Sequence, residues 1–176
     1  MKQLTALTIS IGVLAAVATW LFLAVGGILI WAAFLAWACF YHTGGDRDAL
    51  RNTVVGNVFG SLVGWVAAIV ILAVPLAATL TLPIWAAIVV GITVAILVYA
   101  ANIKAFSVIP AGFYGYAATF AFLLQTPGKL TLANLLSLSL SNAFLVVALS
   151  MVIGAVFGYV SATAGAALMK KETAPA

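Results

Sequence analysis

Long stretches without a charged residue constrain this chain more than any other feature. No formal charge lies between Lys2 and Asp46, and three further uncharged stretches cover residues 52–103, 105–128 and 130–169. A helix that crosses the ~30 Å hydrocarbon core of a bilayer needs about 20 apolar residues. The first two stretches are long enough for two crossings each, so the sequence predicts a chain that passes repeatedly through a membrane.

The composition supports the same class of protein. Apolar residues make up 66% of the 176 residues and charged residues 6%, whereas soluble domains have roughly 45–50% and about 25%. So little polar surface cannot cover a water-soluble domain, which predicts an integral protein whose partner is the lipid bilayer. With seven Lys or Arg and three Asp or Glu, the chain has no nucleic-acid-binding face, and its net charge of +4 favours membrane orientation instead.

The apolar stretches divide into six expected helices. Gly26-Gly27 interrupts the first stretch and the segment 75–83, with a proline at each end, interrupts the second. Continuous apolar runs argue against a membrane β-barrel, whose strands alternate polar and apolar residues. We therefore expect an all-α membrane protein, a six-helix bundle in one transmembrane domain (1–176), with helices at about 4–25, 28–43, 50–74, 83–103, 108–124 and 133–168.

The cations predict the orientation. Six crossings with a cytoplasmic N-terminus put all but one of the Lys and Arg residues inside, and only Lys129 outside. The inside set is Lys2, Arg47, Arg51, Lys104, Lys170 and Lys171. If 28–43 and 108–124 were re-entrant, the bias would reverse. We expect both termini in the cytoplasm, and no signal-peptide cleavage, because the first apolar run is longer than a signal core and continues into more membrane sequence.

Two segments of the chain resemble each other. IWAAFLAWACFYHTGGD (30–46) and IPAGFYGYAATFAFLLQTPGK (109–129) both combine small residues with aromatics and end in Thr-Gly-Gly or Thr-Pro-Gly beside a charge. Each precedes a longer helix with an asparagine near its start, Asn57 or Asn142. The similarity favours two inverted three-helix repeats, 4–74 and 83–168; the alternative is chance recurrence of a composition common in membrane helices.

The repeated segments are also the two shortest expected helices. At about 1.5 Å per residue, each spans less than the hydrocarbon core of a bilayer. Short or interrupted apolar segments at corresponding positions of two halves are the best sequence indication of a transport site. The pattern therefore favours a solute pathway between the halves.

These same motifs carry a family resemblance. WAAFLAWACFYHTGG and the later NIKAFSVIPAGFYGYAATFAF resemble the YcdZ-like family of small bacterial inner-membrane proteins, which contain a domain of unknown function. This chain departs from the family pattern at Ala33 and Ala36, where glycine is usual, at Ala111-Gly112, and in a longer insertion before Gly128. The resemblance implies a multi-pass fold in the bacterial inner membrane and implies no activity.

Aromatic side chains on the two short helices are candidates for a constriction around a small solute. Interfacial belts and ordinary packing are the alternative explanation, and Tyr114 and Tyr116 lie on different faces of one helix. The candidates are Trp31, Phe34, Trp37, Phe40, Phe113, Tyr114 and Tyr116.

Four polar residues complete the candidate pathway. Asn57 and Asn142 lie in apolar segments and need hydrogen-bond partners there, either along a polar pathway or between helices. His42 is a candidate pH gate or an interfacial hydrogen-bonding residue. Lys104 is a candidate cation at a pore mouth or a side chain that extends to the lipid headgroups and sets the topology.

Glycines at four-residue spacing form two candidate packing ridges. Gly56, Gly60 and Gly64 form one, and Gly154 and Gly158 the other. Such small-xxx-small faces allow two helix backbones to approach closely. The neighbour is either another helix of the bundle or a second subunit, which makes a homo-oligomer an expectation.

The residues that are missing narrow the function. One His, one Cys and no acid pair within the apolar segments leave no general acid–base machinery, so we expect neither an enzyme nor a metal or cofactor. Ion-coupled carriers usually place an ionisable residue within the membrane, and none lies deep here. The sequence favours a channel or facilitator for a small neutral or weakly charged solute (urea, amide or ammonia class), with a non-transporting accessory subunit or a secondary carrier as alternatives.

Overall fold

A computed structural model describes residues 1–169 of the chain, and these residues contain helices and no strand. Eight α-helices and two 3-10 turns follow one another within this range. They are α1 (Gln3–Val25), α2 (Ile30–His42), α3 (Arg47–Ala73), α4 (Ala77–Leu80), α5 (Leu82–Tyr99), η1 (Ala100–Asn102), η2 (Lys104–Phe106), α6 (Ile109–Gln125), α7 (Leu132–Leu135) and α8 (Ala143–Leu168).

Four of these helical stretches are long and apolar enough to cross a membrane: α1, α3, α8 and the continuous stretch Leu82–Asn102. The other two expected helices, α2 and α6, have 13 and 17 residues, which span only ~20 Å and ~26 Å. The prediction that the two similar segments form short helices is therefore confirmed. The expected number of six helices is wrong within residues 1–169, because α4 and α7 are additional single turns.

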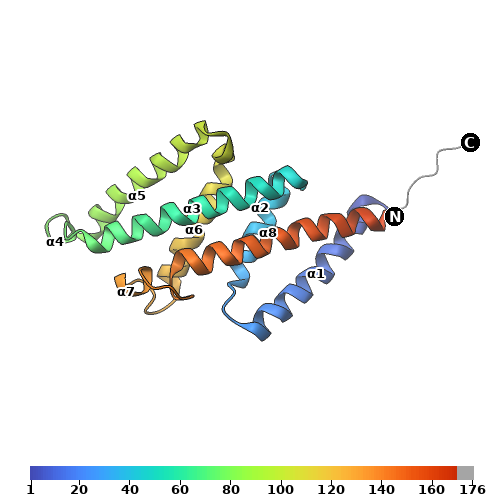
Figure 1. The fold of residues 1–176 in the computed structure, drawn as a ribbon, viewed down its shortest axis with the longest axis horizontal. Coiled ribbons are helices and arrows are strands. Elements are labelled where there is room, and N and C mark those ends of the chain that lie inside the picture. Colours follow the sequence, from blue (N-terminus) through green and yellow to red (C-terminus); the bar gives the residue numbers. More distant parts are fainter. Residues whose placement is uncertain (170–176) are drawn as a thin grey trace, which may run out of the picture.

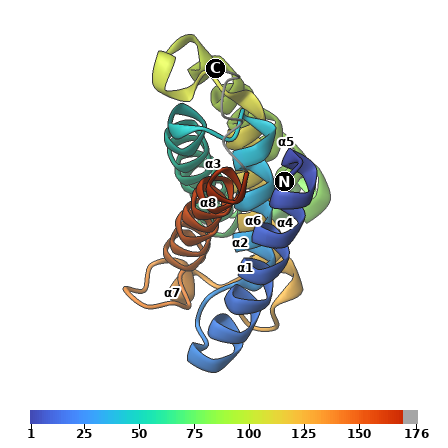
Figure 2. The same ribbon diagram turned by 90° about the vertical axis from the view of Figure 1, so that its right-hand side faces the viewer.

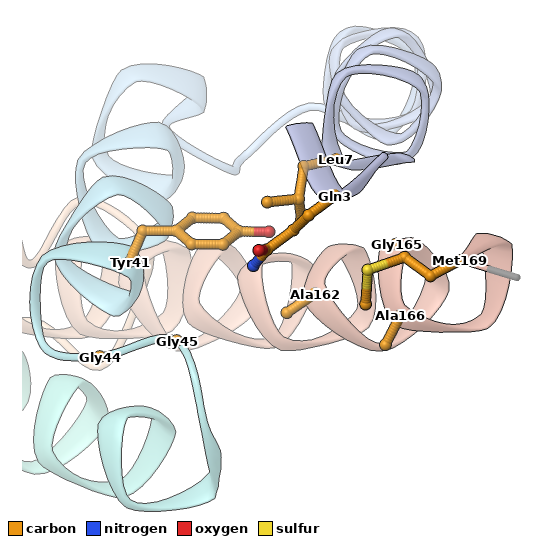
Figure 3. Close-up of a pocket in the computed structure, with 9 residues that line it drawn as sticks. All are labelled: Gln3, Leu7, Tyr41, Gly44, Gly45, Ala162, Gly165, Ala166 and Met169. Atoms are coloured by element: carbon orange, nitrogen blue, oxygen red, sulfur yellow. The ribbon is translucent and has the colours of Figure 1, made fainter. Parts of the chain in front are cut away.

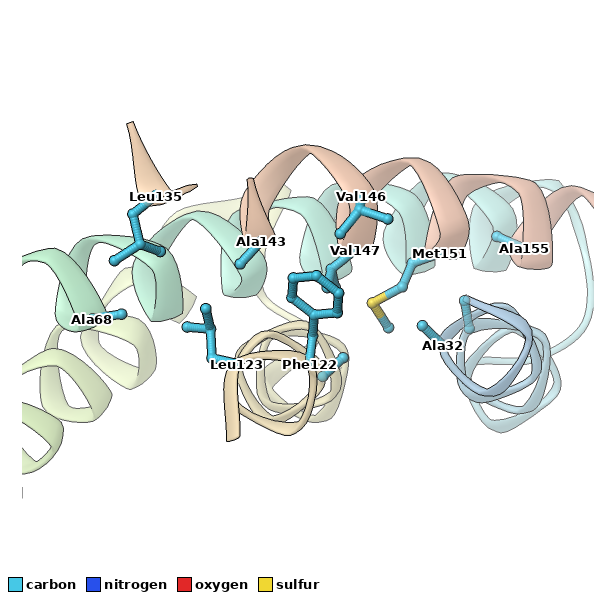
Figure 4. Close-up of a cluster of buried hydrophobic side chains, with 12 residues drawn as sticks. Ala32, Ala68, Phe122, Leu123, Leu135, Ala143, Val146, Val147, Met151 and Ala155 are labelled. Atoms are coloured by element: carbon cyan, nitrogen blue, oxygen red, sulfur yellow. The ribbon is translucent and has the colours of Figure 1, made fainter. Parts of the chain in front are cut away.

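The two longest helices form the centre of the molecule. Figure 1 shows α3 and α8 running side by side in opposite directions, with α1 and α5 splayed on opposite sides of the pair. The short helices α2 and α6 lie steeply across α3 and α8, so that Figure 4 views the short pair end-on while the long pair runs across the picture. Each short helix has a different main partner: α2 packs mainly on α8, and α6 packs mainly on α3.

Local side-chain chemistry sets the boundaries of these helices. The Asp46 carboxylate accepts a hydrogen bond from the Ala49 amide at 2.7 Å, so α3 begins at Arg47 rather than at residue 50. Side-chain caps of this kind satisfy amides that have no partner inside the helix. Gly26 and Gly27 have φ angles of 71° and 73°, a left-handed conformation that glycine adopts without steric cost, and they separate α1 from α2.

The expected continuous helix over 133–168 is wrong. The chain forms the single turn α7, then a non-helical segment 136–142, and only then α8. Asn142 is the reason, because its side-chain oxygen accepts from the Phe144 amide at 2.9 Å and starts a new helix there. Serines in the preceding Ser-Leu-Ser-Leu-Ser run bond to each other and to nearby backbone, for example Ser137 to Asn134 at 2.9 Å, which competes with helix formation.

Three clusters of buried apolar side chains hold the helices together. The central cluster joins α2, α3, α6, α7 and α8 through residues such as Phe122 and Met151 (Figure 4). A second cluster joins α1 and α2 to α8 around Phe22 and Trp37, and α1 packs mainly on α8. Figure 2 shows these three helices grouped together. A third joins α5 and α6 to α3 around Val89. The outer helices α1 and α2 thus pack on α8, whereas α5 and α6 pack on α3.

Cationic residues gather at one end of the molecule. A cavity lined by Gln3, Gly45 and Met169 brings together the start of α1, the α2–α3 turn and the end of α8. Lys2 and the first turn of α3 lie at this end, together with Lys104, which shares a cavity with Arg51. Lys129 lies at the opposite end, where its ammonium donates to Ser141 at 2.9 Å. Lys170 and Lys171, which the sequence places with the first group, lie outside the described residues.

Candidate functional site

The glycine ridge of α3 packs against α6 within the same chain. A Cβ added at Gly60 would overlap the backbone carbonyl oxygen of Gly112, and one at Gly56 would overlap the Ala111 side chain. At Gly64, a Cβ would lie 3.2 Å from the Tyr116 carbonyl oxygen. The absence of side chains therefore lets the two backbones touch, as expected for small-xxx-small faces.

The ridge on α8 makes the equivalent contact with α2. A Cβ at Gly154 would overlap the backbone carbonyl of Ala33, and one at Gly158 would lie 2.8 Å from the Phe40 ring. Both ridges are thus covered by helices of the same chain, which decides between the two neighbours left open by the sequence. The ridges accordingly give no support to the expected homo-oligomer.

A row of buried polar residues follows one face of α3. Thr53, Asn57 and Ser61 lie four residues apart, which places them on one side of the helix, and all three are 0% exposed. The Thr53 hydroxyl lies 3.1 Å from that of Thr43, at the end of α2. Counting about 1.5 Å per residue, this polar row extends ~12 Å from the α2–α3 turn into the centre of the molecule.

The hydroxyl groups at the inner end of the polar row have backbone partners. Ser61 Oγ donates to the Gly115 carbonyl at 3.3 Å, and Thr119 Oγ1 lies 3.0 Å from the same oxygen. Gly115 makes this approach possible, because a Cβ there would overlap the Asn57 carbonyl. The α3–α6 contact is therefore polar as well as close.

Asn57 differs from its neighbours in the polar row. Its side-chain amide nitrogen and oxygen are both buried, and neither has a hydrogen-bond partner among residues 1–169. An unsatisfied buried polar group costs about 1–3 kcal/mol, and such groups are rare enough in native proteins to require an explanation. Asn57 is therefore the strongest candidate functional residue.

Asn142, which the sequence pairs with Asn57, has a different environment. Its amide nitrogen donates to the carbonyl oxygens of Leu135 at 2.7 Å and Ser137 at 3.0 Å, while its oxygen caps α8. The Trp65 indole also donates to the Leu135 carbonyl, at 2.8 Å. Every hydrogen-bonding group of the Asn142 side chain is thus used to join the α7 turn to α8.

The aromatic candidates on α2 do not form one lining. Trp37 and Phe40 are buried, whereas Trp31 and Phe34 are 39% and 37% exposed on the outside of the bundle. The Trp37 indole donates to Ser161 on α8 at 3.0 Å, and the Tyr41 hydroxyl lies 2.7 Å from the same Ser161 oxygen. Since Ser161 donates its own hydrogen to the Gly158 carbonyl at 2.7 Å, it acts as acceptor for both aromatic groups.

The candidates on α6 divide in the same way. Tyr116 is buried, and its hydroxyl lies 2.9 Å from that of Thr93 on α5. Phe113 is 41% exposed, and Tyr114 is half-buried with its ring centroid 6.4 Å from that of His42. The buried aromatics therefore join helices, whereas the exposed ones lie on the outside of the bundle.

His42 and Lys104 lie at the cationic end of the molecule, and both are exposed. His42 is the last residue of α2, and Lys104 lies in the turn η2. Within residues 1–169, no group of three His, Cys, Asp or Glu side chains is arranged to hold a metal ion.

A cavity of about 240 Å³ opens between α1, α8 and the end of α2. Figure 3 shows the Tyr41 hydroxyl pointing across it toward Gln3, with the Gly44-Gly45 turn along one wall. The same turn follows Thr43, the outer partner of the polar row. The cavity therefore lies beside the outer end of the polar row.

Sequence analysis did not identify three residues that form the polar contacts of this region. Thr53 and Thr119 belong to the α3–α6 side, and Ser161 binds Trp37 and Tyr41. The four-residue spacing of Thr53, Asn57 and Ser61 was the available signal, since it predicts one buried face. Ser161 gave no local signal, because its two aromatic partners lie more than a hundred residues earlier in the chain.

No curated protein and no solved structure matches the chain. The narrower YcdZ-like resemblance stays a prediction. A family model described as "Protein of unknown function (DUF1097)" matches residues 8–166, so the chain belongs to that family of uncharacterised proteins.

Proposed function

We propose that this protein is a passive facilitator for a small uncharged polar solute, with a pathway that passes Asn57 where the short helices cross the long ones. The orphaned amide of Asn57 is the observation that carries the proposal. A solute in transit would supply the partner that the amide lacks. The described packing then corresponds to the closed pathway, since Asn57 is 0% exposed.

The chemistry of the polar row indicates the class of solute. A carboxamide offers two N–H donors and one carbonyl acceptor, which are complementary to urea and to small amides. The buried residues of the row are uncharged, and an ion without a counter-charge or water is costly to place inside a membrane. The cavity beside Tyr41 and Gly45 would serve as the entrance on one side.

The pathway is proposed to lie between two inverted repeats. Gly60 of α3 meets Gly112, and Gly154 of α8 meets Ala33; Ala33 and Gly112 occupy the same place in the two similar segments, three residues after an isoleucine. This register relates α1–α2–α3 to α5–α6–α8, with each short helix packed on the long helix of the other half.

The same register changes the match made from sequence. If Gly60 corresponds to Gly154, Asn57 corresponds to Met151 and not to Asn142. Met151 is also fully buried, so the two halves would place an amide and a thioether at equivalent central positions. A pathway with one polar contact at its centre is consistent with passive passage, and we propose no catalytic step and no cofactor.

Vesicle flux tests this proposal. Purified protein in liposomes should increase the stopped-flow swelling rate with urea, acetamide or ammonia above that of empty vesicles. Asn57→Leu, which keeps a similar volume but removes both polar groups, should return the rate to that of empty vesicles. Guanidinium has nearly the shape of urea but carries a charge, so wild-type protein should not accelerate its entry.

Asn102→Leu is the matched control for this experiment. It makes the same chemical change at an exposed position beyond α5, and it should leave the solute flux unchanged. Equal rates for empty and wild-type vesicles across the three solutes, or an unchanged rate for Asn57→Leu, would contradict the proposal.

Labelling tests the proposed six crossings and their orientation in the inner membrane. In a background of Cys39→Ala, single cysteines at Lys2 and Lys104 should react with a membrane-impermeant thiol reagent only from the cytoplasm. A cysteine at Pro127, an exposed position beside Lys129, should react only from the other side, because an odd number of crossings separates it from Lys104. Reaction of all three from one side would exclude both the topology and the inverted repeat.

A further inference from the structure

A polar cavity at the cationic end of the molecule has no part in the proposed solute pathway. It measures about 250 Å³ and lies between the first turn of α3 and the turn η2. That volume is roughly eight times the ~30 Å³ share of one water molecule, enough for a phosphodiester with a small alcohol. The lining residues are Asp48, Arg51, Asn52, Lys104, Ala105 and Ser107.

An apolar groove lies next to this cavity. Its lining follows α3 from Val54 to Leu62 and includes Phe59 and Phe106. At about 1.5 Å per residue, the groove extends ~12 Å from the charged end toward the middle of the bundle. Unlike the polar row, which faces the interior, the groove is open to the surroundings of the bundle, with Leu62 38% exposed.

One aromatic pair joins the two spaces. Phe106 follows Ala105 directly, and its ring stacks on Phe59 with centroids 4.2 Å apart and an interplanar angle of 24°. This stack holds η2 against α3, so that Lys104 lines the polar cavity while Phe106 lines the groove. The polar cavity with its two cations therefore continues into the apolar groove along α3.

We propose that the polar cavity and the groove together bind one anionic phospholipid, with the headgroup between Arg51 and Lys104 and an acyl chain along Val54–Leu62. Charge complementarity selects this occupant, since two cations and one carboxylate give the cavity a net positive charge. Basic pockets between membrane helices are known to bind anionic headgroups. Arg51 and Lys104 are suited to a phosphodiester as bidentate and point-charge donors.

The remaining polar groups of the cavity fit a headgroup that carries hydroxyls. Asn52 and Ser107 can donate to phosphate oxygens, and the Asp48 carboxylate can accept only from a donor. A glycerol headgroup supplies such hydroxyl donors, so phosphatidylglycerol satisfies the cations and Asp48 at once. Phosphatidylcholine has the same phosphate but offers no N–H or O–H donor and no net negative charge.

Native mass spectrometry of the full chain in detergent tests the inference, with phosphatidylglycerol and phosphatidylcholine titrated under equal conditions. Wild-type protein should bind phosphatidylglycerol more tightly. Arg51→Gln and Lys104→Gln should each weaken that binding about fivefold, which is the change in affinity expected for the loss of one cation near an anionic headgroup. The charge-conserving pair Arg51→Lys and Lys104→Arg should retain the preference, which separates lost charge from lost fold.

Two further arms distinguish a lipid site from simpler binding. Lys2→Gln removes an exposed cation at the same end of the molecule but outside the cavity, and it should leave the affinity unchanged. Val58→Trp, which fills the groove, should weaken phosphatidylglycerol binding, and excess glycerol 3-phosphate should not displace the lipid. Equal affinity for both lipids, an equal loss in Lys2→Gln, or displacement by glycerol 3-phosphate would overturn the inference.

Discussion

Gly60→Val should lower the free energy of unfolding by at least about 3 kcal/mol, at the upper end of the range for overpacking. The added Cβ would overlap the Gly112 carbonyl oxygen, and this atom belongs to the backbone of α6, which cannot move by a change of rotamer. The α3–α6 contact would have to separate along its whole length. Unfolding in increasing mole fractions of SDS, followed by circular dichroism, measures the loss.

Gly91→Val is the matched control for this prediction. Gly91 lies inside α5, and a Cβ there would have no heavy atom within 4 Å. The same substitution should therefore change the free energy of unfolding by less than about 1 kcal/mol, the scale of helix propensities. A similar loss at both positions would mean that the α3–α6 contact is not the cause.

Asn57→Leu should not lower the free energy of unfolding, whereas Asn142→Leu should lower it, although the chemical change is the same. At position 57 the substitution removes two buried polar atoms that have no hydrogen-bond partner within the described part of the chain, so the free energy of unfolding should stay unchanged or rise by up to about 2 kcal/mol. At position 142 it removes a helix cap and two hydrogen bonds to carbonyl oxygens, so the free energy should fall by about 2 kcal/mol.

The same SDS titration measures the free energy of unfolding of the two variants. A clear destabilisation in Asn57→Leu would show that the amide has a partner in the native protein and would remove the main support for the proposed pathway. Combined with the flux measurement, a stable Asn57→Leu variant without flux would identify Asn57 as a residue kept for passage at the expense of stability.

The overall class of structure followed from the uncharged apolar runs. Backbone groups in a bilayer must find partners within their own segment, so long apolar runs such as those containing α1 and α3 predict helices without knowledge of the fold. The short length of α2 and α6 was predicted for the same reason, because Gly, Pro and charged residues limit each run. The break before α8 was not predicted, since the hydropathy of the Ser-Leu repeat hides its local hydrogen bonds.

The candidate site could be predicted only in part. Gly60 and Gly154 were identified as packing residues by their spacing, but spacing does not say which helix covers them. Asn57 and Asn142 have similar settings in the sequence, yet one is orphaned and the other is fully bonded. The difference arises because the turn between α7 and α8 brings the Leu135 carbonyl, at the end of α7, within hydrogen-bonding distance of the Asn142 amide.

The sequence by itself determined that this is a helical membrane protein with two short helices, because helix formation in an apolar environment depends on each segment's own backbone. Tertiary structure alone decided that both glycine ridges are covered within the chain, that Asn57 has no hydrogen-bond partner among residues 1–169, and that Arg51 and Lys104 line one cavity. Contacts between helices depend on crossing geometry and on residues distant in the chain. One-dimensional spacing does not contain that information.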